Sequence, residues 1–162
     1  MARVTDQHPI LNSITKTVVL HDVDSRIPNL ALLKLGTFYR QQGWRVVLSR
    51  ARDRAKQAVT IDADLHLGSV VFRTPSSARA VEKLRALYGD RIEFGGSGVD
   101  LAKRLPPEVE ACFPDYGLYD HTLYALGFLT RGRTKRCPFC VVPEKEGRLQ
   151  RQAASFDDFV RF

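Results

Sequence analysis

The fold of this chain is decided by Val18-Val-Leu-His-Asp-Val-Asp-Ser-Arg-Ile-Pro-Asn-Leu-Ala-Leu-Leu-Lys-Leu35, where a strand pattern gives way to a helix pattern. Val18-Val-Leu20 predicts the first strand, and either Asp24 or Ser25 is placed to cap the following helix. Pro28 lies in the expected first turn. One face of this helix is apolar at helical spacing, through Ile27, Leu30, Ala31, Leu35 and Phe38.

The alternation of strand and helix patterns continues downstream and predicts an α/β fold with a parallel sheet. Gly43 ends the first helix, and Trp44-Arg-Val-Val-Leu48 predicts the second strand. Residues 51–60 predict either a short helix or a loop, and Leu65–Phe72 predicts the third strand. Thr74 caps the next helix, which Pro75 starts and Gly89 ends, and Arg91–Phe94 predicts the fourth strand.

The last third of the chain reads as a boundary followed by a second unit. Residues 105–114 predict a proline-bounded helical turn, and the turn-rich stretch up to Asp120 predicts a linker. Leu123-Tyr-Ala-Leu-Gly-Phe-Leu129 predicts a fifth strand, and Ser155–Val160 a short terminal helix. We therefore divide the chain into an N-terminal extension over 1–16, an α/β domain over 17–120 and a second unit over 121–162.

Composition is that of an ordinary globular protein, with 44% hydrophobic and 27% charged residues in 162. No apolar stretch approaches the roughly 20 residues that cross a bilayer, and residues 1–6 lack the apolar core of a signal peptide. Two of the three cysteines form a Cys-x-x-Cys pair, which fits a reducing compartment better than a disulfide framework. These features predict a cytoplasmic protein with no membrane partner.

The net charge of +7 attracts anions such as phosphate or nucleic acid. Many of the arginines are spread along the chain, which favours a solvated surface over a binding face. An alternative is a basic nucleic-acid- or nucleotide-binding module centred on Arg131, Arg133, Lys135 and Arg136.

Cys137-Pro-Phe-Cys140 can present two thiolates to one soft metal ion or iron–sulfur cluster, because the intervening turn points both sulfurs the same way. Together with Gly127-Phe-Leu-Thr-Arg-Gly132 and Val141-Val-Pro-Glu-Lys-Glu-Gly147, this pair resembles the cluster-binding segment of radical S-adenosylmethionine (radical SAM) proteins. That family spaces three cysteines as C-x-x-x-C-x-x-C, and SAM binds the fourth iron of its [4Fe–4S] cluster. Cys137 and Cys140 fall on the second and third positions, and Arg133 stands at the first.

Two upstream segments, His21–Leu35 and Gly95–Asp100, look like the cobalamin-binding-like domain that precedes the barrel in one radical SAM branch. The resemblance implies a flavodoxin/cobalamin-binding-like (Rossmann-like) parallel-sheet domain over 17–120. It implies the first β/α unit of a radical SAM barrel over 121–162. Because proteins of this family continue well beyond such a unit, we expect a truncated relative of the Fe–S oxidoreductases.

Arg133 cannot ligate iron, since its guanidinium stays protonated. We therefore expect weakened cluster binding and no cleavage of SAM by this chain alone. Missing ligands could come from Cys112, from an exogenous ligand or from a homodimer, and the missing barrel from a separate subunit. The cobalamin motif D-x-H-x-x-G is matched neither at His21 nor around His66, so we expect a cobalamin-like fold without cobalamin.

Two further features lie where parallel sheets usually bind ligands. Gly95, Gly96 and Gly98 could approach a phosphate or cofactor closely, although a plain tight turn explains the same glycines. The charged residues after the first strand, Asp22, Asp24 and Arg26, could bind a ligand or could cap a helix and pair with one another. A non-catalytic remnant that folds without binding anything is the remaining alternative.

Overall fold

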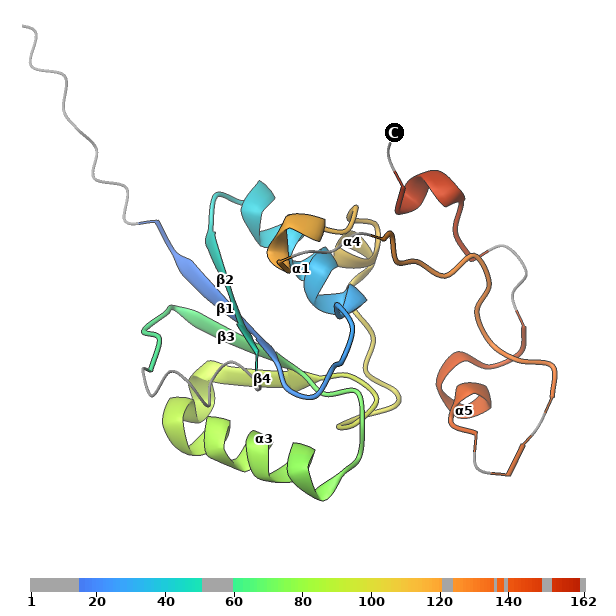
Figure 1. Ribbon diagram of the computed structural model, residues 1–162, viewed down its shortest axis with the longest axis horizontal. Coiled ribbons are helices and arrows are strands. Elements are labelled where there is room, and N and C mark those ends of the chain that lie inside the picture. Colours follow the sequence, from blue (N-terminus) through green and yellow to red (C-terminus); the bar gives the residue numbers. More distant parts are fainter. Residues whose placement is uncertain are drawn as a thin grey trace, which may run out of the picture.

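A four-stranded, all-parallel sheet in the order β2-β1-β3-β4 forms the centre of the molecule (Figure 1). The computed structural model describes residues 15–50, 60–120, 124–135, 137–138, 140–149 and 153–160. Its strands are β1 (Thr17–Asp22), β2 (Arg45–Arg50), β3 (Leu65–Ser69) and β4 (Ile92–Gly95). The predicted α/β class with a parallel sheet is thus confirmed.

Two helices cover opposite faces of the sheet, α1 (Leu30–Gln41) on one side and α3 (Pro75–Tyr88) on the other (Figure 1). Side chains alternate along β1, so Val18 and Leu20 pack against α1. The α3 side is filled by a second buried cluster, made of Val23, Val70, Leu84, Tyr88, Ile92 and Phe94. Each fully buried leucine or valine in these two layers contributes about 1.5–3 kcal/mol. The helix that follows β1 and the helix that follows β3 therefore lie on opposite faces of the sheet (Figure 1).

The cap of α1 is Asn29, so the predicted cap at Asp24 or Ser25 is wrong. The Asn29 Oδ1 atom accepts a hydrogen bond from the Ala31 N–H at 3.1 Å. Pro28 lies before the helix, outside its first turn. The reason is a tertiary contact, because the Asp24 carboxylate accepts a hydrogen bond from the Val71 N–H at 2.8 Å and is therefore held away from the helix.

The predicted start and end of α3 are confirmed, with Thr74 Oγ1 accepting from the Ser77 N–H at 3.1 Å and Gly89 adopting a φ of 57°. The preceding strand is shorter than predicted. It ends at Ser69, and beyond Val70 the N–H groups of Val71 and Phe72 donate to Asp24 instead of to a neighbouring strand.

Residues 124–129 form no strand, so the predicted fifth strand is wrong over this range. The Leu126 N–H donates to the Tyr116 hydroxyl at 2.9 Å in place of a strand partner. A Cβ on Gly127 would lie 2.2 Å from the Phe159 ring, so that ring covers the backbone here. At the outer edge of β4, the Phe94 carbonyl accepts a hydrogen bond from the Lys103 Nζ at 3.0 Å.

Short elements complete the described chain. The predicted proline-bounded turn is present as α4 (Pro107–Glu110), and η2 spans Tyr116–Leu118. The C-terminal segment, defined here as the described residues from 124 to 160, contains α5 (Val142–Glu146) and η3 (Phe156–Asp158). Residues 51–59, expected as a helix or loop, lie outside the described residues. Within the described ranges no helix has the length and apolar character to cross a membrane.

Candidate functional site

Cys137 and Cys140 lie on one turn, which the Cys140 N–H closes by donating to the Cys137 carbonyl at 3.0 Å. Both side chains are partly exposed. The Arg133 Nη1 atom lies 3.0 Å from the Cys140 sulfur and donates to it. The pKa of the Cys140 thiol is lowered, first because the Val142 N–H donates to the sulfur and then because of Arg133. Both donors therefore stabilise the thiolate form of Cys140 relative to that of an ordinary cysteine.

A close approach of two backbone stretches closes the loop that carries this turn. Gly132 has a φ of 78°, and a Cβ there would lie 2.2 Å from the Arg148 carbonyl oxygen. Next to it, the Arg133 N–H donates to the Gly147 carbonyl at 3.4 Å. Only glycine fits at position 132, since a side chain there meets both an unfavourable φ and the opposite backbone.

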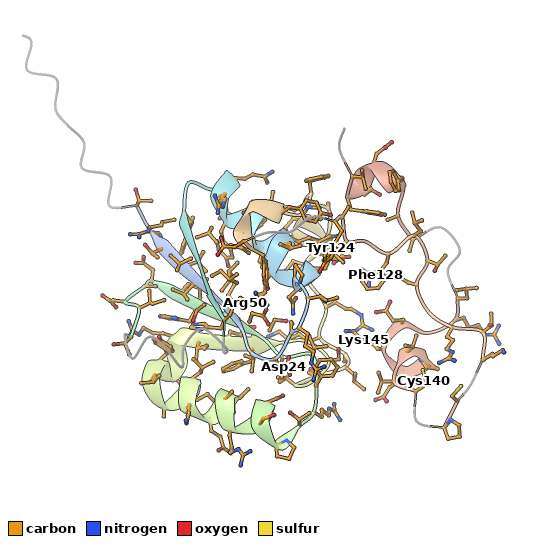
Figure 2. The ribbon with its side chains drawn as sticks, viewed as in Figure 1. Asp24, Arg50, Tyr124, Phe128, Cys140 and Lys145 are labelled. Carbon is orange, nitrogen blue, oxygen red and sulfur yellow. The ribbon has the colours of Figure 1, made fainter. Side chains whose placement is uncertain are left out.

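Polar contacts anchor the same loop to the sheet domain. Arg131 pairs with Glu110 of α4 at 2.5 Å and with Glu146 of α5 at 3.3 Å. The Lys145 Nζ donates to Ser97 Oγ at 3.0 Å. Cys140 and Lys145 both belong to the C-terminal segment in Figure 2. The structure thus joins the cysteine loop to the Gly95–Gly98 loop, a contact that sequence spacing alone does not indicate.

The glycines after β4 have a structural reason within the chain. Gly96 has a φ of 98°, and a Cβ on it would lie 2.3 Å from the Val70 carbonyl oxygen. A Cβ on Gly98 would lie 2.7 Å from the Phe72 carbonyl oxygen. The two loops at this end of the sheet therefore pack backbone against backbone. This packing accounts for Gly96 and Gly98 as a tight turn, and a cofactor role for them and for Gly95 stays a prediction.

A cavity of about 290 Å³ lies beside this turn, between α1 and the strands β3 and β4. Leu32, Leu35 and Leu67 contribute apolar walls, and Gly95 and Gly96 contribute to its rim. Its volume is at the lower limit of sites that enclose small organic ligands. The glycines of the predicted site therefore border this cavity.

The acidic residues that follow β1 are engaged within the chain. The Asp24 carboxylate accepts from the Val71 and Phe72 N–H groups at 2.8 and 3.0 Å, and from Ser77 Oγ at 2.8 Å. Because three internal donors already occupy this carboxylate, its role in the structure is to join the loops after β1 and β3. Figure 2 labels Asp24 at this end of the sheet.

Asp22 is also buried and occupied, since it accepts from the Tyr119 hydroxyl at 3.0 Å and lies 3.6 Å from the Arg50 Nε. Burial, then the charge of Asp22, raises the pKa of Tyr119. Arg50 was not predicted as part of this group. Its position at the end of β2 could have indicated it, because the parallel register of β1 and β2 sets Asp22 opposite Arg50.

A second group that was not predicted is the pair of histidines inside the sheet, His21 and His66. Both are fully buried, with His21 Nε2 3.0 Å from His66 Nδ1. The ring of Tyr88 stacks on His66 at a centroid distance of 3.8 Å. Burial, and secondarily the charge of Arg91, lowers the pKa of His66. This histidine is therefore a core residue of β3.

A complete [4Fe–4S] site does not fit the described part of a single chain. Among the described residues, no three His, Cys, Asp or Glu side chains gather closely enough to hold a metal ion. Cys112 follows α4, where its sulfur lies 3.3 Å from the Glu108 carbonyl oxygen, and it does not join Cys137 and Cys140. At the position of the absent third thiolate, Arg133 directs an N–H group at Cys140. The described part of the chain thus places two sulfurs, those of Cys137 and Cys140, on this turn.

No protein-family model matches this chain, and no curated protein or solved structure matches it either.

Proposed function

We propose that this chain is a radical SAM-like protein that binds a soft metal ion or an iron–sulfur cluster through Cys137 and Cys140, and that it does not cleave SAM on its own. The observation that carries the proposal is the turn that holds both cysteines, which the Cys140 N–H closes by donating to the Cys137 carbonyl at 3.0 Å. The two sulfurs are close in the chain, and cysteine thiolates are the preferred ligands of zinc and of iron–sulfur clusters.

The order of the strands supports the proposed ancestry. The order β2-β1-β3-β4 agrees with the first four strands of the flavodoxin-like arrangement, in which ligands bind at the carboxyl ends of the strands. We assign the α/β domain to the cobalamin-binding-like type, without bound cobalamin. Residues 121–162 would correspond to the start of a radical SAM barrel. A reducing compartment such as the cytoplasm would keep both thiols available.

The remaining ligands come from outside the chain in this proposal. A second copy is the simplest source, because two Cys137–Cys140 pairs make the four thiolates that a closed tetrahedral zinc site or a [2Fe–2S] cluster needs. The expected stoichiometry is about one zinc ion or one cluster for two chains. A separate subunit that carries the rest of the barrel is the other source.

Arg133 opposes the metal in two ways. Its N–H group occupies the Cys140 sulfur, and its positive charge repels a cation there. The metal must displace this contact before it binds. We therefore expect Arg133→Gln to bind the metal more tightly than the unchanged chain, and Arg133→Cys to gain a third thiolate and bind more tightly still.

The test is a titration of the reduced, metal-free protein with cobalt(II) under anaerobic conditions, followed by the thiolate-to-cobalt absorption. The unchanged chain and both Arg133 variants should develop this absorption, in the order of affinity given above. Cys112→Ser is the matched control and should titrate like the unchanged chain, because its sulfur contacts Glu108 and not the cysteine turn. If a Cys137→Ser/Cys140→Ser variant gives the same absorption, the proposal is refuted.

Reconstitution with iron and sulfide separates zinc-like binding from cluster assembly. Iron and sulfide contents should reach about two of each for two unchanged chains if a [2Fe–2S] cluster is shared. Cobalt binding without any retained iron or sulfide would restrict the function to a single metal ion.

A further inference from the structure

The stretch from His121 to Pro143 contains no acidic residue, although the chain as a whole has 18. The same stretch holds four of the 25 lysines and arginines, namely Arg131, Arg133, Lys135 and Arg136. Cations are about as frequent here as in the rest of the chain, so the net positive charge of the stretch comes from the absence of acidic residues between Asp120 and Glu144. Such a block attracts a polyanion and repels other cations.

Exposed aromatic side chains lie at the start of the same stretch. Tyr124 and Phe128 are 51% and 55% exposed, and Leu129 beside them is 49% exposed. Because Tyr124, Phe128 and Leu129 lie within six residues of one another, they place a group of exposed apolar side chains on one short segment, which is typical of a surface that meets a partner. Figure 2 shows both rings on the side of the molecule that carries the C-terminal segment.

The backbone beneath these rings is fixed by hydrogen bonds. The Leu126 N–H donates to the Tyr116 hydroxyl at 2.9 Å, and that hydroxyl donates to the Phe159 carbonyl at 2.7 Å. Farther along, the Ala153 N–H donates to the Leu129 carbonyl at 2.9 Å. The rings are therefore displayed on a held segment, and a partner does not have to order that backbone on binding.

The cations that follow are available to different degrees. Arg131 is taken up by Glu110 and Glu146, and its guanidinium lies 5.2 Å from the centre of the Phe128 ring. Arg131 therefore packs on the Phe128 ring and is already paired with carboxylates, so it is less available to a phosphate. Arg133 and Lys135 are exposed, and Arg133 uses one of its N–H groups on Cys140. Two exposed cations thus follow two exposed rings along the segment.

We propose that residues 124–135, the aromatic–basic segment, bind single-stranded nucleic acid. Bases stack on the rings of Tyr124 and Phe128, and Arg133 and Lys135 pair with backbone phosphates. This combination of stacking surfaces and positive charge is the chemistry by which proteins hold single strands without reading sequence. A duplex hides its base faces and meets only the cations, so it binds more weakly.

The test measures fluorescence anisotropy of labelled oligonucleotides of about 12 nucleotides, oligo(U), oligo(dT) and a duplex of the same length. Both single strands should bind, and the duplex should bind more weakly. Stronger binding of oligo(U) than of oligo(dT) assigns the site to RNA, and the reverse order assigns it to DNA. Phe128→Ala should weaken single-strand binding about tenfold, because one base no longer stacks on a ring. Phe72→Ala, which removes a 52% exposed ring outside the segment, is the matched control and should leave binding unchanged.

Salt dependence tests the role of the cations. For single strands, the slope of log affinity against log salt becomes shallower by about 0.7 when a cation that pairs with one phosphate is removed. Lys135→Gln should reduce the slope by that amount, and Lys83→Gln on α3 should not change it. A Cys137→Ser/Cys140→Ser variant should still bind the oligonucleotide, since both rings and both cations remain. This variant therefore separates the nucleic-acid site from the proposed metal site.

Three results would overturn the proposal. The first is no binding of either single strand at low salt, and the second is equal binding of the single strand and the duplex by the unchanged chain. The third is a dimer, seen by sedimentation without nucleic acid, that Phe128→Ala dissociates. That last result would assign the exposed rings to a second copy of the chain.

Discussion

Removing the Asp24 carboxylate should destabilise the sheet domain more than the removal of any other single exposed or half-exposed charge. Asp24 lies after β1 and accepts three hydrogen bonds from the loop and helix that follow β3. Two of these hydrogen bonds, from the Val71 N–H and the Ser77 hydroxyl, are partly buried. The bond from the Phe72 N–H is exposed, so water can replace the carboxylate there. The carboxylate therefore ties two separate loops to the same end of the sheet.

The expected destabilisation follows from these bonds. A hydrogen bond to a charged group contributes about 1.5–3 kcal/mol, and counting the two partly buried ones at the lower value gives about 3 kcal/mol for Asp24→Ala. Asp24→Asn keeps one acceptor but turns an NH₂ group toward a donor, so it should cost about 2 kcal/mol. Both values are a large part of the 5–15 kcal/mol that stabilises a typical domain.

Urea unfolding followed by circular dichroism measures this destabilisation. With a slope of about 1.5 kcal/mol/M, the midpoint of Asp24→Ala should fall by about 2 M. The matched control is Asp62→Ala, which breaks the exposed ion pair with Arg91 at 3.3 Å and should cost at most about 1 kcal/mol. If Asp24→Ala costs no more than this control, the loops are held by something other than the carboxylate.

Three further predictions concern buried and anchoring groups. The lowered pKa of His66, buried against His21, means that the folded state binds its proton less readily than the unfolded chain, so the free energy of unfolding should fall as the pH drops below about 6.5. Urea midpoints across that range check this, and an unchanged midpoint contradicts it. Gly68→Ala should lower thermal stability by about 1–3 kcal/mol, because its Cβ would lie 2.4 Å from the Phe94 ring; calorimetry that shows a rise in melting temperature excludes this clash. Tyr116→Phe removes the hydroxyl bonded to the C-terminal segment, so hydrogen exchange of the segment's amides should accelerate while that of the strands stays the same.

Local signals predicted the elements that depend only on nearby residues. Thr74, Pro75 and Gly89 mark both ends of α3 because caps, first-turn prolines and left-handed stops act within one turn of the chain. The parallel sheet could also be predicted, because strand patterns that alternate with helix patterns are typical of parallel strands. Asn29 was missed as the cap of α1 because its rival Asp24 bonds to Val71, 47 residues away, a contact that no local pattern reveals.

The prediction of a fifth strand was wrong for a related reason. An apolar run becomes a strand only where a free strand edge accepts it, and the outward carbonyl of β4 at Phe94 is taken by Lys103. The local sequence of Leu123–Leu129 contains no information about that competitor. At the cysteine turn, sequence spacing located both sulfurs but not the contact of Lys145 with Ser97, which brings the turn to the sheet.

The cysteine loop is attached to the sheet domain mainly by ion pairs and side-chain hydrogen bonds, such as those of Arg131 and Lys145, and has little share in the buried layers. Replacing a residue in a loop attached in this way leaves no cavity in the core. The sheet domain therefore keeps its stability when the loop changes. Side-chain type and charge at the loop can thus change with little effect on the sheet domain, whereas the strands are constrained by their tightly packed neighbours. An arginine such as Arg133 next to Cys137 and Cys140 is a change that a loop attached in this way tolerates without loss of stability in the sheet domain.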